Sequence, residues 1–127
     1  MRRFKHELEQ EVNAVFSNFL YEQLGQHATS VQTFLSGNML TVRALNCLAP
    51  GEQQLAQNHQ HWKLLQETKT LEFNKVKPLL LKTLEKVTNC KVLNIYSLFG
   101  QDGVRFEVVT LSDNLERKLL KLKGIEP

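Results

Sequence analysis

Two segments of alternating side chains, Ser30–Leu48 and Lys91–Leu111, constrain the fold of this chain more than any other feature of its sequence. Successive side chains of a β-strand point to opposite faces, so an alternation of apolar and polar residues is typical of a strand with one buried face. Each segment has turn residues near its middle, which predicts an antiparallel β-hairpin. The sequence therefore predicts four strands of antiparallel sheet.

The first hairpin has a register that its turn residues define. Gly37 and Asn38 form a two-residue turn, and a leading glycine favours a type II′ connection. One face of the pair then gathers the apolar residues of a core. The predicted pairs on that face are Leu35 with Leu40, Thr33 with Val42 and Val31 with Ala44, and those on the other are Ser36 with Met39, Phe34 with Thr41 and Gln32 with Arg43.

The second hairpin is predicted with a longer connection. A four-residue loop, Phe99–Asp102, would join its strands and set their register. The predicted pairs are Leu93 with Val108, Ile95 with Phe106 and Ser97 with Val104 on one face, and Asn94 with Glu107 and Tyr96 with Arg105 on the other.

Helices are predicted directly before and directly after the first hairpin. Apolar residues recur at steps of three and four over Arg3–Leu24, which predicts an amphipathic helix, and Gly25 is a typical residue at a helix end. After the hairpin, Pro50 suits the first position of a short helix, where its missing N–H costs nothing. Glu52 adds a negative charge that stabilises this helix N-terminus.

A long helical pattern precedes the second hairpin, and a short one follows it. The first extends from Trp62 to Asn89, and Pro78 inside it predicts a kink or a break. The last helix is expected to have Ser112 or Asp113 as its N-cap and to end at Gly124. The predicted order is α-β-β-α-α-β-β-α, so the fold class is α+β, with helices packed on an antiparallel sheet.

Composition bounds the protein class. A chain of 127 residues that is 42% apolar and 23% charged predicts one domain, residues 1–127. Its apolar stretches fall short of the roughly 18 residues that indicate a membrane span, and its first residues lack the apolar core of a signal peptide. We expect a cytoplasmic protein that can be peripheral to a membrane, with Cys47 and Cys90 reduced.

Charge is distributed unevenly along the chain. Residues 1–62 contain four Lys or Arg and five Asp or Glu, whereas residues 63–127 contain twelve and eight. A basic half permits contact with nucleic acid or an anionic membrane surface. Lysines on solvated helix faces give the same totals, and this second interpretation is favoured because the basic residues form no dense cluster.

Motifs for chemistry are missing from the sequence. His59 and His61 have no third metal ligand nearby, and two residues apart on a helix their side chains diverge. The sequence contains no nucleophile elbow, no local cysteine signature and no glycine-rich phosphate loop. We therefore expect a protein that is not an enzyme and that has no metal or cofactor.

The candidate site is an interaction face of the predicted sheet. It comprises Phe34, Arg43, Tyr96, Phe99 and Arg105. An aromatic residue at the tip of a polar loop, such as Phe99, can contact a partner, and it can equally fold back on the core. Aromatic and cationic side chains together also occur on sheets that stack RNA bases, but an aromatic motif of that type is missing. A covering helix or subunit explains the aromatic residues more simply.

The same face is predicted to be unusually apolar. Its apolar members would be Phe34, Met39, Leu45, Val92, Tyr96 and Val109. Together with the wide apolar stripe of Arg3–Leu24, this surface predicts a homodimer that is joined through the first helix or through the exposed sheet. The alternatives are a nucleic-acid- or nucleotide-linked regulator that uses the basic helices after Lys63, and an enzyme with a site assembled across a dimer interface.

Three segments of the chain resemble the MpsC-like family. They are the run Thr29–Arg43, with a strand start and a glycine turn, the helix start Leu48–Ala56, and the helix end Glu85–Asn89 before the second hairpin. The resemblance covers about residues 9–111. The chain differs from the family pattern at Gln32, where a basic residue is usual, at Ala49, where a capping threonine is usual, and at Asn89, which replaces glycine.

The resemblance implies a link to membrane transport. MpsC-like proteins are associated with a Na⁺-translocating, membrane-potential-generating system whose related membrane subunits are linked to inorganic carbon supply. By this resemblance we expect a non-enzymatic cytoplasmic accessory or regulatory protein, whose partners are membrane transporter subunits and a second copy of the chain.

Overall fold

The computed structural model describes residues 4–122. They form helices packed on a four-stranded antiparallel sheet, which confirms the α+β class and the predicted order. The helices and strands are α1 (Lys5–Leu24), β1 (Ser30–Ser36), β2 (Met39–Leu45), α2 (Pro50–Ala56), α3 (His59–Thr88), β3 (Val92–Phe99), β4 (Arg105–Leu111) and α4 (Leu115–Leu122).

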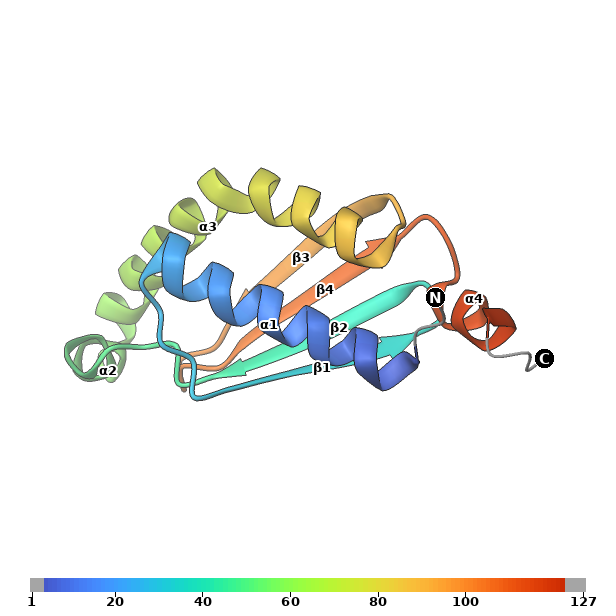
Figure 1. Ribbon diagram of the computed structural model, residues 1–127. Helices are drawn as coiled ribbons and strands as arrows, with labels where there is room; N and C mark the ends of the chain where they lie inside the picture. The colour runs from blue at the N-terminus through green and yellow to red at the C-terminus, as the bar shows by residue number, and fades with distance from the viewer. Residues whose placement is uncertain (1–3, 123–127) are drawn as a thin grey trace.

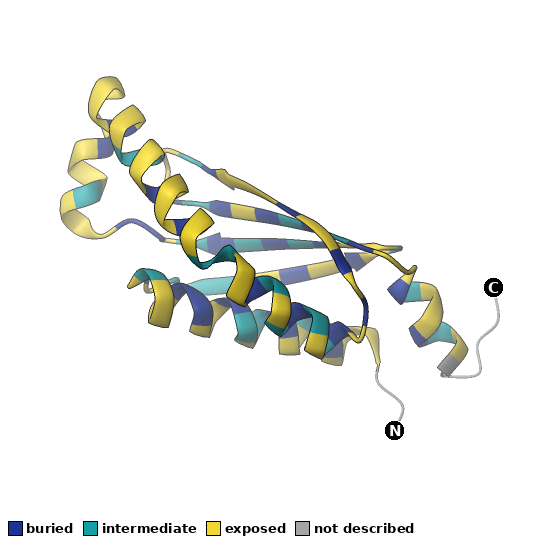
Figure 2. Cartoon of the chain, turned by 90° about the horizontal axis from the view of Figure 1, so that it is seen from above, coloured by how far each residue is buried: buried dark blue, intermediate teal, exposed yellow. Residues whose placement is uncertain are grey.

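In the described part of the chain, helices cover only one face of the sheet. The strand order is β1-β2-β4-β3, so β1 and β3 are the edge strands. Figure 1 shows α1 and α3 on the same side of this sheet, with α2 beyond one end of the strands and α4 beyond the other. We call the helix-covered side the core face and the opposite side the open face. On the helices, buried residues lie toward the sheet and exposed residues lie outward (Figure 2).

The first hairpin has the predicted register. Leu35 pairs with Leu40 and Phe34 pairs with Thr41, as the turn residues indicated. Gly37 has a positive φ of 61°, whereas Asn38 is not among the residues with positive φ. A positive φ at the first turn position alone is the geometry of a type II′ turn. The short turn therefore fixed the side-chain alternation of both strands correctly.

The predicted register of the second hairpin is wrong by three residues. Ile95 pairs with Val109 rather than Phe106, and Phe99 pairs with Arg105. The reason is a longer connection, because the Gly100 N–H donates to the Val104 carbonyl at 2.8 Å and closes a five-residue loop. An odd shift of register reverses the faces of a strand. In β4, Arg105 and Glu107 consequently lie on the core face.

The helix boundaries confirm most of the sequence signals. Gly25 ends α1 with a left-handed φ of 64°, and Asn89 ends α3 with a φ of 55°. The helix α3 begins at His59, where the Asn58 side chain caps it. It continues through Pro78, so a break there is excluded, and its ribbon changes direction along its length (Figure 1).

The cap of α4 differs from the expectation. Asn114, rather than Ser112 or Asp113, places its side-chain oxygen 3.0 Å from a backbone N–H of the first turn. Asp113 instead forms an exposed ion pair with Lys118 at 3.2 Å. The predicted end of this helix at Gly124 lies outside the described residues.

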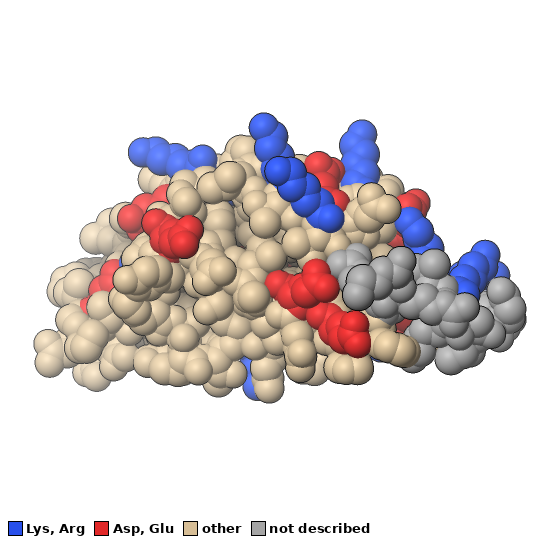
Figure 3. Space-filling model, viewed as in Figure 1, with Lys and Arg blue, Asp and Glu red and all other residues tan. Residues whose placement is uncertain are grey.

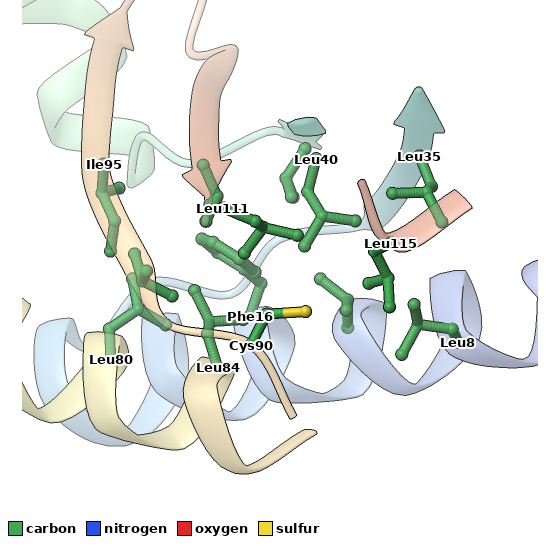
Figure 4. Packing of buried hydrophobic residues seen from close by; sticks show 14 of the residues in the cluster. Leu8, Phe16, Leu35, Leu40, Leu80, Leu84, Cys90, Ile95, Leu111 and Leu115 are labelled. Atoms are coloured by element: carbon green, nitrogen blue, oxygen red, sulfur yellow. The ribbon is translucent and has the colours of Figure 1, made fainter. Parts of the chain in front are cut away.

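The core lies between α1, α3 and the sheet. Phe19 of α1 and Phe73 of α3 meet edge to face, with 6.0 Å between their ring centroids. Both cysteines are free and buried, and Cys90 packs within this core. Figure 4 shows Leu8 and Phe16 of α1 and Leu80 and Leu84 of α3 converging on side chains of the strands and of α4, which are Leu35, Leu40, Ile95, Leu111 and Leu115.

The carboxylate of Glu116 connects α4 to two distant parts of the chain. One oxygen accepts the Gly37 N–H at 3.1 Å, and the other accepts the Lys5 ammonium at 2.6 Å. These hydrogen bonds lower the pKa of Glu116, chiefly through Lys5. Because the folded carboxyl has the lower pKa, its contribution to stability is present above its ordinary pKa and is lost as pH falls through the folded value.

We therefore expect Glu116→Gln to lower the free energy of unfolding at pH 7 by about 1 kcal/mol. The glutamine loses the ion pair with Lys5, whereas its oxygen can still accept the Gly37 N–H in a neutral hydrogen bond. Urea unfolding at pH 7 and at pH 3 would measure this change. The difference from wild type should shrink at pH 3, where the wild-type carboxyl is increasingly protonated. Asp113→Asn, which removes only an exposed ion pair, is the control and should change stability little. An equal loss in the two variants would contradict this role.

Candidate interaction face

The open face of the sheet exposes large apolar side chains. Phe34 and Tyr96 are each 57% exposed and Leu98 is 64% exposed, although all three belong to strands. Strand residues of this size are usually covered by a helix, a second sheet or a partner. The apolar residues of the open face are Phe34, Met39, Leu45, Tyr96, Leu98, Phe106 and Val108.

Strand pairing arranges these residues in rows across the sheet. One row runs from Phe34 through Thr41 and Val108 to Tyr96. It places an aromatic ring on each edge strand and a smaller side chain on each inner strand. The next row contains Gln32, Arg43, Phe106 and Leu98.

Arg43 is the one charged residue at the open-face positions of the four strands, all of which lie in the described part of the chain. Its Nη2 atom donates to the side-chain oxygen of Gln32 on the neighbouring strand, at 2.6 Å. The guanidinium is therefore held along the sheet rather than extended into solvent. It adds a cation beside Phe106, its partner in the strand ladder.

The structure separates the five residues predicted to form an interaction face. Phe34, Arg43 and Tyr96 lie on the open face, as expected. Phe99 and Arg105 lie on the core face, only 6% and 2% exposed, so their assignment to the interaction face is wrong, and Phe99 follows the alternative of folding back on the core. The register of β4 turns Arg105 inward and also moves Val109 to the core face. Phe99 is the last residue of β3 rather than part of the loop, and it is buried like Ile95 of the same strand. Val92 is buried because a bulge between Val92 and Asn94 shifts the alternation of β3.

Arg105 is a structural residue of the core. Its guanidinium lies between the rings of Phe73 and Phe99, with its central carbon 5.2 Å and 4.6 Å from their centroids. Its Nη1 atom pairs with the Glu107 carboxylate at 3.0 Å and with the Ser97 hydroxyl at 3.2 Å. Burial raises the pKa of Glu107, while Arg105 acts in the opposite direction. Arg105 contacts α3 through Phe73, while its Nε and Nη2 atoms and Oε2 of Glu107 are buried without a hydrogen-bond partner within residues 4–122.

Leu98, Phe106 and Val108 are the open-face residues that sequence reasoning missed. The predicted register assigned Phe106 and Val108 to the buried side because they alternate with Arg105 and Glu107. Gly100 and Gly103 are the sequence signal that could have revealed these residues, because two glycines permit a longer loop and hence another register of β4. Gly103 adopts a positive φ of 84° in that loop.

Charge elsewhere on the molecule follows the helices. In Figure 3 acidic side chains lie over α1, and basic side chains project along α3, with acidic ones among them, and near α4. The basic side chains of α3 therefore lie on the opposite side of the sheet from the open-face aromatics, whereas α4 lies beyond the end of the strands. With Arg105 in the core, the combination of rings and cations that suggested RNA stacking is reduced to one arginine.

Among the described residues, the two histidines near the start of α3 are not part of a group of side chains that could hold a metal ion. His59 and His61 are both exposed in the first turn of α3. Within residues 4–122, no group of three or more His, Cys, Asp or Glu side chains is arranged to hold a metal ion.

Residues 4–113 match the protein family described as "Na+-translocating membrane potential-generating system (MpsC)". The chain belongs to the MpsC family. This match covers most of the chain and confirms the resemblance seen in its strand and helix starts. No curated protein matches the chain, and no solved structure matches it.

The family name associates this MpsC chain with a membrane system. None of the helices in the described residues is long and apolar enough to cross a membrane. The structural features that the MpsC match spans include both hairpins and therefore the whole open face.

A pair of matched arginine substitutions tests the two faces of the MpsC sheet. Arg105→Leu should lower the free energy of unfolding by about 3–5 kcal/mol, because it leaves Glu107 buried without its cation. Arg43→Leu, at the partly exposed position on the open face, should change it by no more than about 0.5 kcal/mol. Chemical denaturation of both variants measures these effects. Equal losses would contradict the assignment of Arg105 to the core.

Proposed function

We propose that this chain is a non-enzymatic accessory subunit of a Na⁺-translocating, membrane-potential-generating system and that it acts as a homodimer. The observation that carries the proposal is the open face, which exposes aromatic and aliphatic side chains on a rigid sheet. Exposed apolar patches of this kind mark sites of protein association. The description of the MpsC family names the membrane system to which we assign this association.

Two ion pairs of the described residues connect helices that surround the sheet. Lys69 of α3 and Glu52 of α2 are 2.8 Å apart, and Lys5 of α1 reaches Glu116 of α4. Partial burial tends to raise the pKa of Glu52, but hydrogen bonds from Lys69 and the Ala49 N–H lower it overall. These charges hold the helices in place around the sheet.

Apolar residues of α1 favour the open face over α1 as the dimer surface. The apolar stripe that made the first helix a candidate for dimerisation is buried against the sheet of the same chain. Its buried members are Leu8, Val12, Phe16, Phe19 and Leu20. The helix is thus already used in the core, whereas the open face remains uncovered.

The proposed location is the cytoplasmic side of the membrane, with the protein held there peripherally by its transport partner. In a dimer that pairs the open faces, the helices would lie outward.

Deletion of the encoding gene in cells that depend on Na⁺ translocation tests the proposal. We expect a smaller Na⁺-dependent membrane potential, measured with a potential-sensitive dye, and restoration by the wild-type chain. A Phe34→Lys/Tyr96→Lys variant should restore less than a control Leu71→Lys variant on α3. An unchanged potential after deletion would contradict the accessory role.

A further inference from the structure

Side chains already occupy some of the outward backbone groups on both edge strands of the sheet. On β1, the Leu35 N–H points away from β2 and donates to the Glu9 carboxylate of α1 at 2.8 Å. On β3, the Phe99 carbonyl accepts from Gln66 of α3 at 3.2 Å, and the Asn94 side chain accepts the Ile95 N–H at 2.8 Å. A strand from another chain would have to displace these bonds, so pairing through the edges is disfavoured.

The open face is large enough for a dimer of modest interface size. Four strands of seven or eight residues span roughly 20 Å by 23 Å, given the usual strand spacing and rise. The flat area of such a face is about 460 Å², or about 900 Å² for two copies, and the protruding side chains of Phe34, Tyr96 and Leu98 add accessible surface to it. Biological interfaces begin at about 1,000 Å² in total.

A twofold rotation brings complementary side chains of two copies of this face opposite each other. An axis that runs along the strands between β2 and β4 places β1 of one copy over β3 of the other. Phe34 then faces Tyr96 of the partner subunit, twice, which allows offset or edge-to-face contacts between rings. Arg43 faces Phe106 of the partner subunit, so the two arginines do not meet and each can lie over a ring.

We propose that two copies of this chain pack open face to open face about this axis, as a four-layer sandwich with both helical layers outside. The inference rests on the homodimer of the proposed function and adds its surface, its symmetry and its contacts. Paired sheets of this type lie about 10 Å apart with interleaved side chains. A second copy fits this face because the face carries no carboxylate and one cation that the partner's ring accommodates.

Sedimentation equilibrium of the full chain tests the surface. Wild type should be a dimer, and Phe34→Lys/Tyr96→Lys should raise the dimer dissociation constant at least 30-fold, about the effect of losing one hot spot. The control Leu71→Lys, at a residue that is 66% exposed on α3, should leave the constant unchanged. Circular dichroism shows whether each variant is folded. A monomeric wild type, or a dimer that the double variant does not weaken, would overturn the proposal.

Cysteine cross-linking tests the axis. In the proposed dimer, position 34 faces position 96 of the partner subunit across the separation of about 10 Å between paired sheets. A bis-maleimide that spans this separation should link a mixture of Phe34→Cys protein and Tyr96→Cys protein into a covalent dimer, and each protein alone should form much less. Wild type, whose Cys47 and Cys90 are buried, gives the background.

Efficient self-linkage of Phe34→Cys alone would overturn the axis. Dimer formation and the Na⁺-dependent potential are separate measurements. If the wild-type chain is monomeric but its deletion still lowers the potential, the dimer inference fails while the accessory role stands. If the dimer forms as proposed and deletion leaves the potential unchanged, the accessory role fails while the dimer inference stands.

Discussion

The packing of α1 and α3 against a single face of the sheet is the constraint on which the rest of the structure depends. Both helices bury their apolar stripes there, so every strand must direct one set of alternating residues toward them. The other set is then left on the open face, whatever its polarity. Here that set includes Phe34, Tyr96 and Leu98, and an exposed apolar surface follows directly from one-sided coverage.

The buried ion pair of β4 is a second consequence of this packing. The alternation that exposes Phe106 and Val108 also places Arg105 and Glu107 under α3. A charged pair in a core costs desolvation energy that it offsets only with good geometry and further hydrogen bonds. Two aromatic rings and the Ser97 hydroxyl supply some of these contacts, and Nε and Nη2 of Arg105 and Oε2 of Glu107 have no hydrogen-bond partner in the part of the chain that the structure describes. The chain thus keeps polar residues inside while apolar residues lie outside, which suits a sheet whose outer face is also to be covered.

The pairing of the first hairpin could be predicted from the sequence, whereas that of the second hairpin could not, for physical reasons. A two-residue turn at Gly37 leaves one register, so all pairs of the first hairpin could be written from the sequence. The loop after Phe99 contains two glycines and can close at several lengths, so the faces of β4 remained undetermined by local signals. Pattern reasoning assigned the apolar members of β4 to the core, and only the packing against Phe73 shows why Arg105 occupies that position instead. The candidate face was therefore recognised through Phe34, Arg43 and Tyr96, and incorrectly extended to Phe99 and Arg105.

Hydroxyl-radical footprinting of the two tyrosines tests the central claim, that the open face is covered by a second copy, most directly. Tyr96 on the open face and Tyr21 on α1 are almost equally exposed in a single chain, at 57% and 56%. The account predicts that oxidation of Tyr96 slows as protein concentration rises through the dimerisation range, while oxidation of Tyr21 is unchanged. Rates for Tyr96 that do not depend on concentration, or protection of Tyr21 instead, would contradict it.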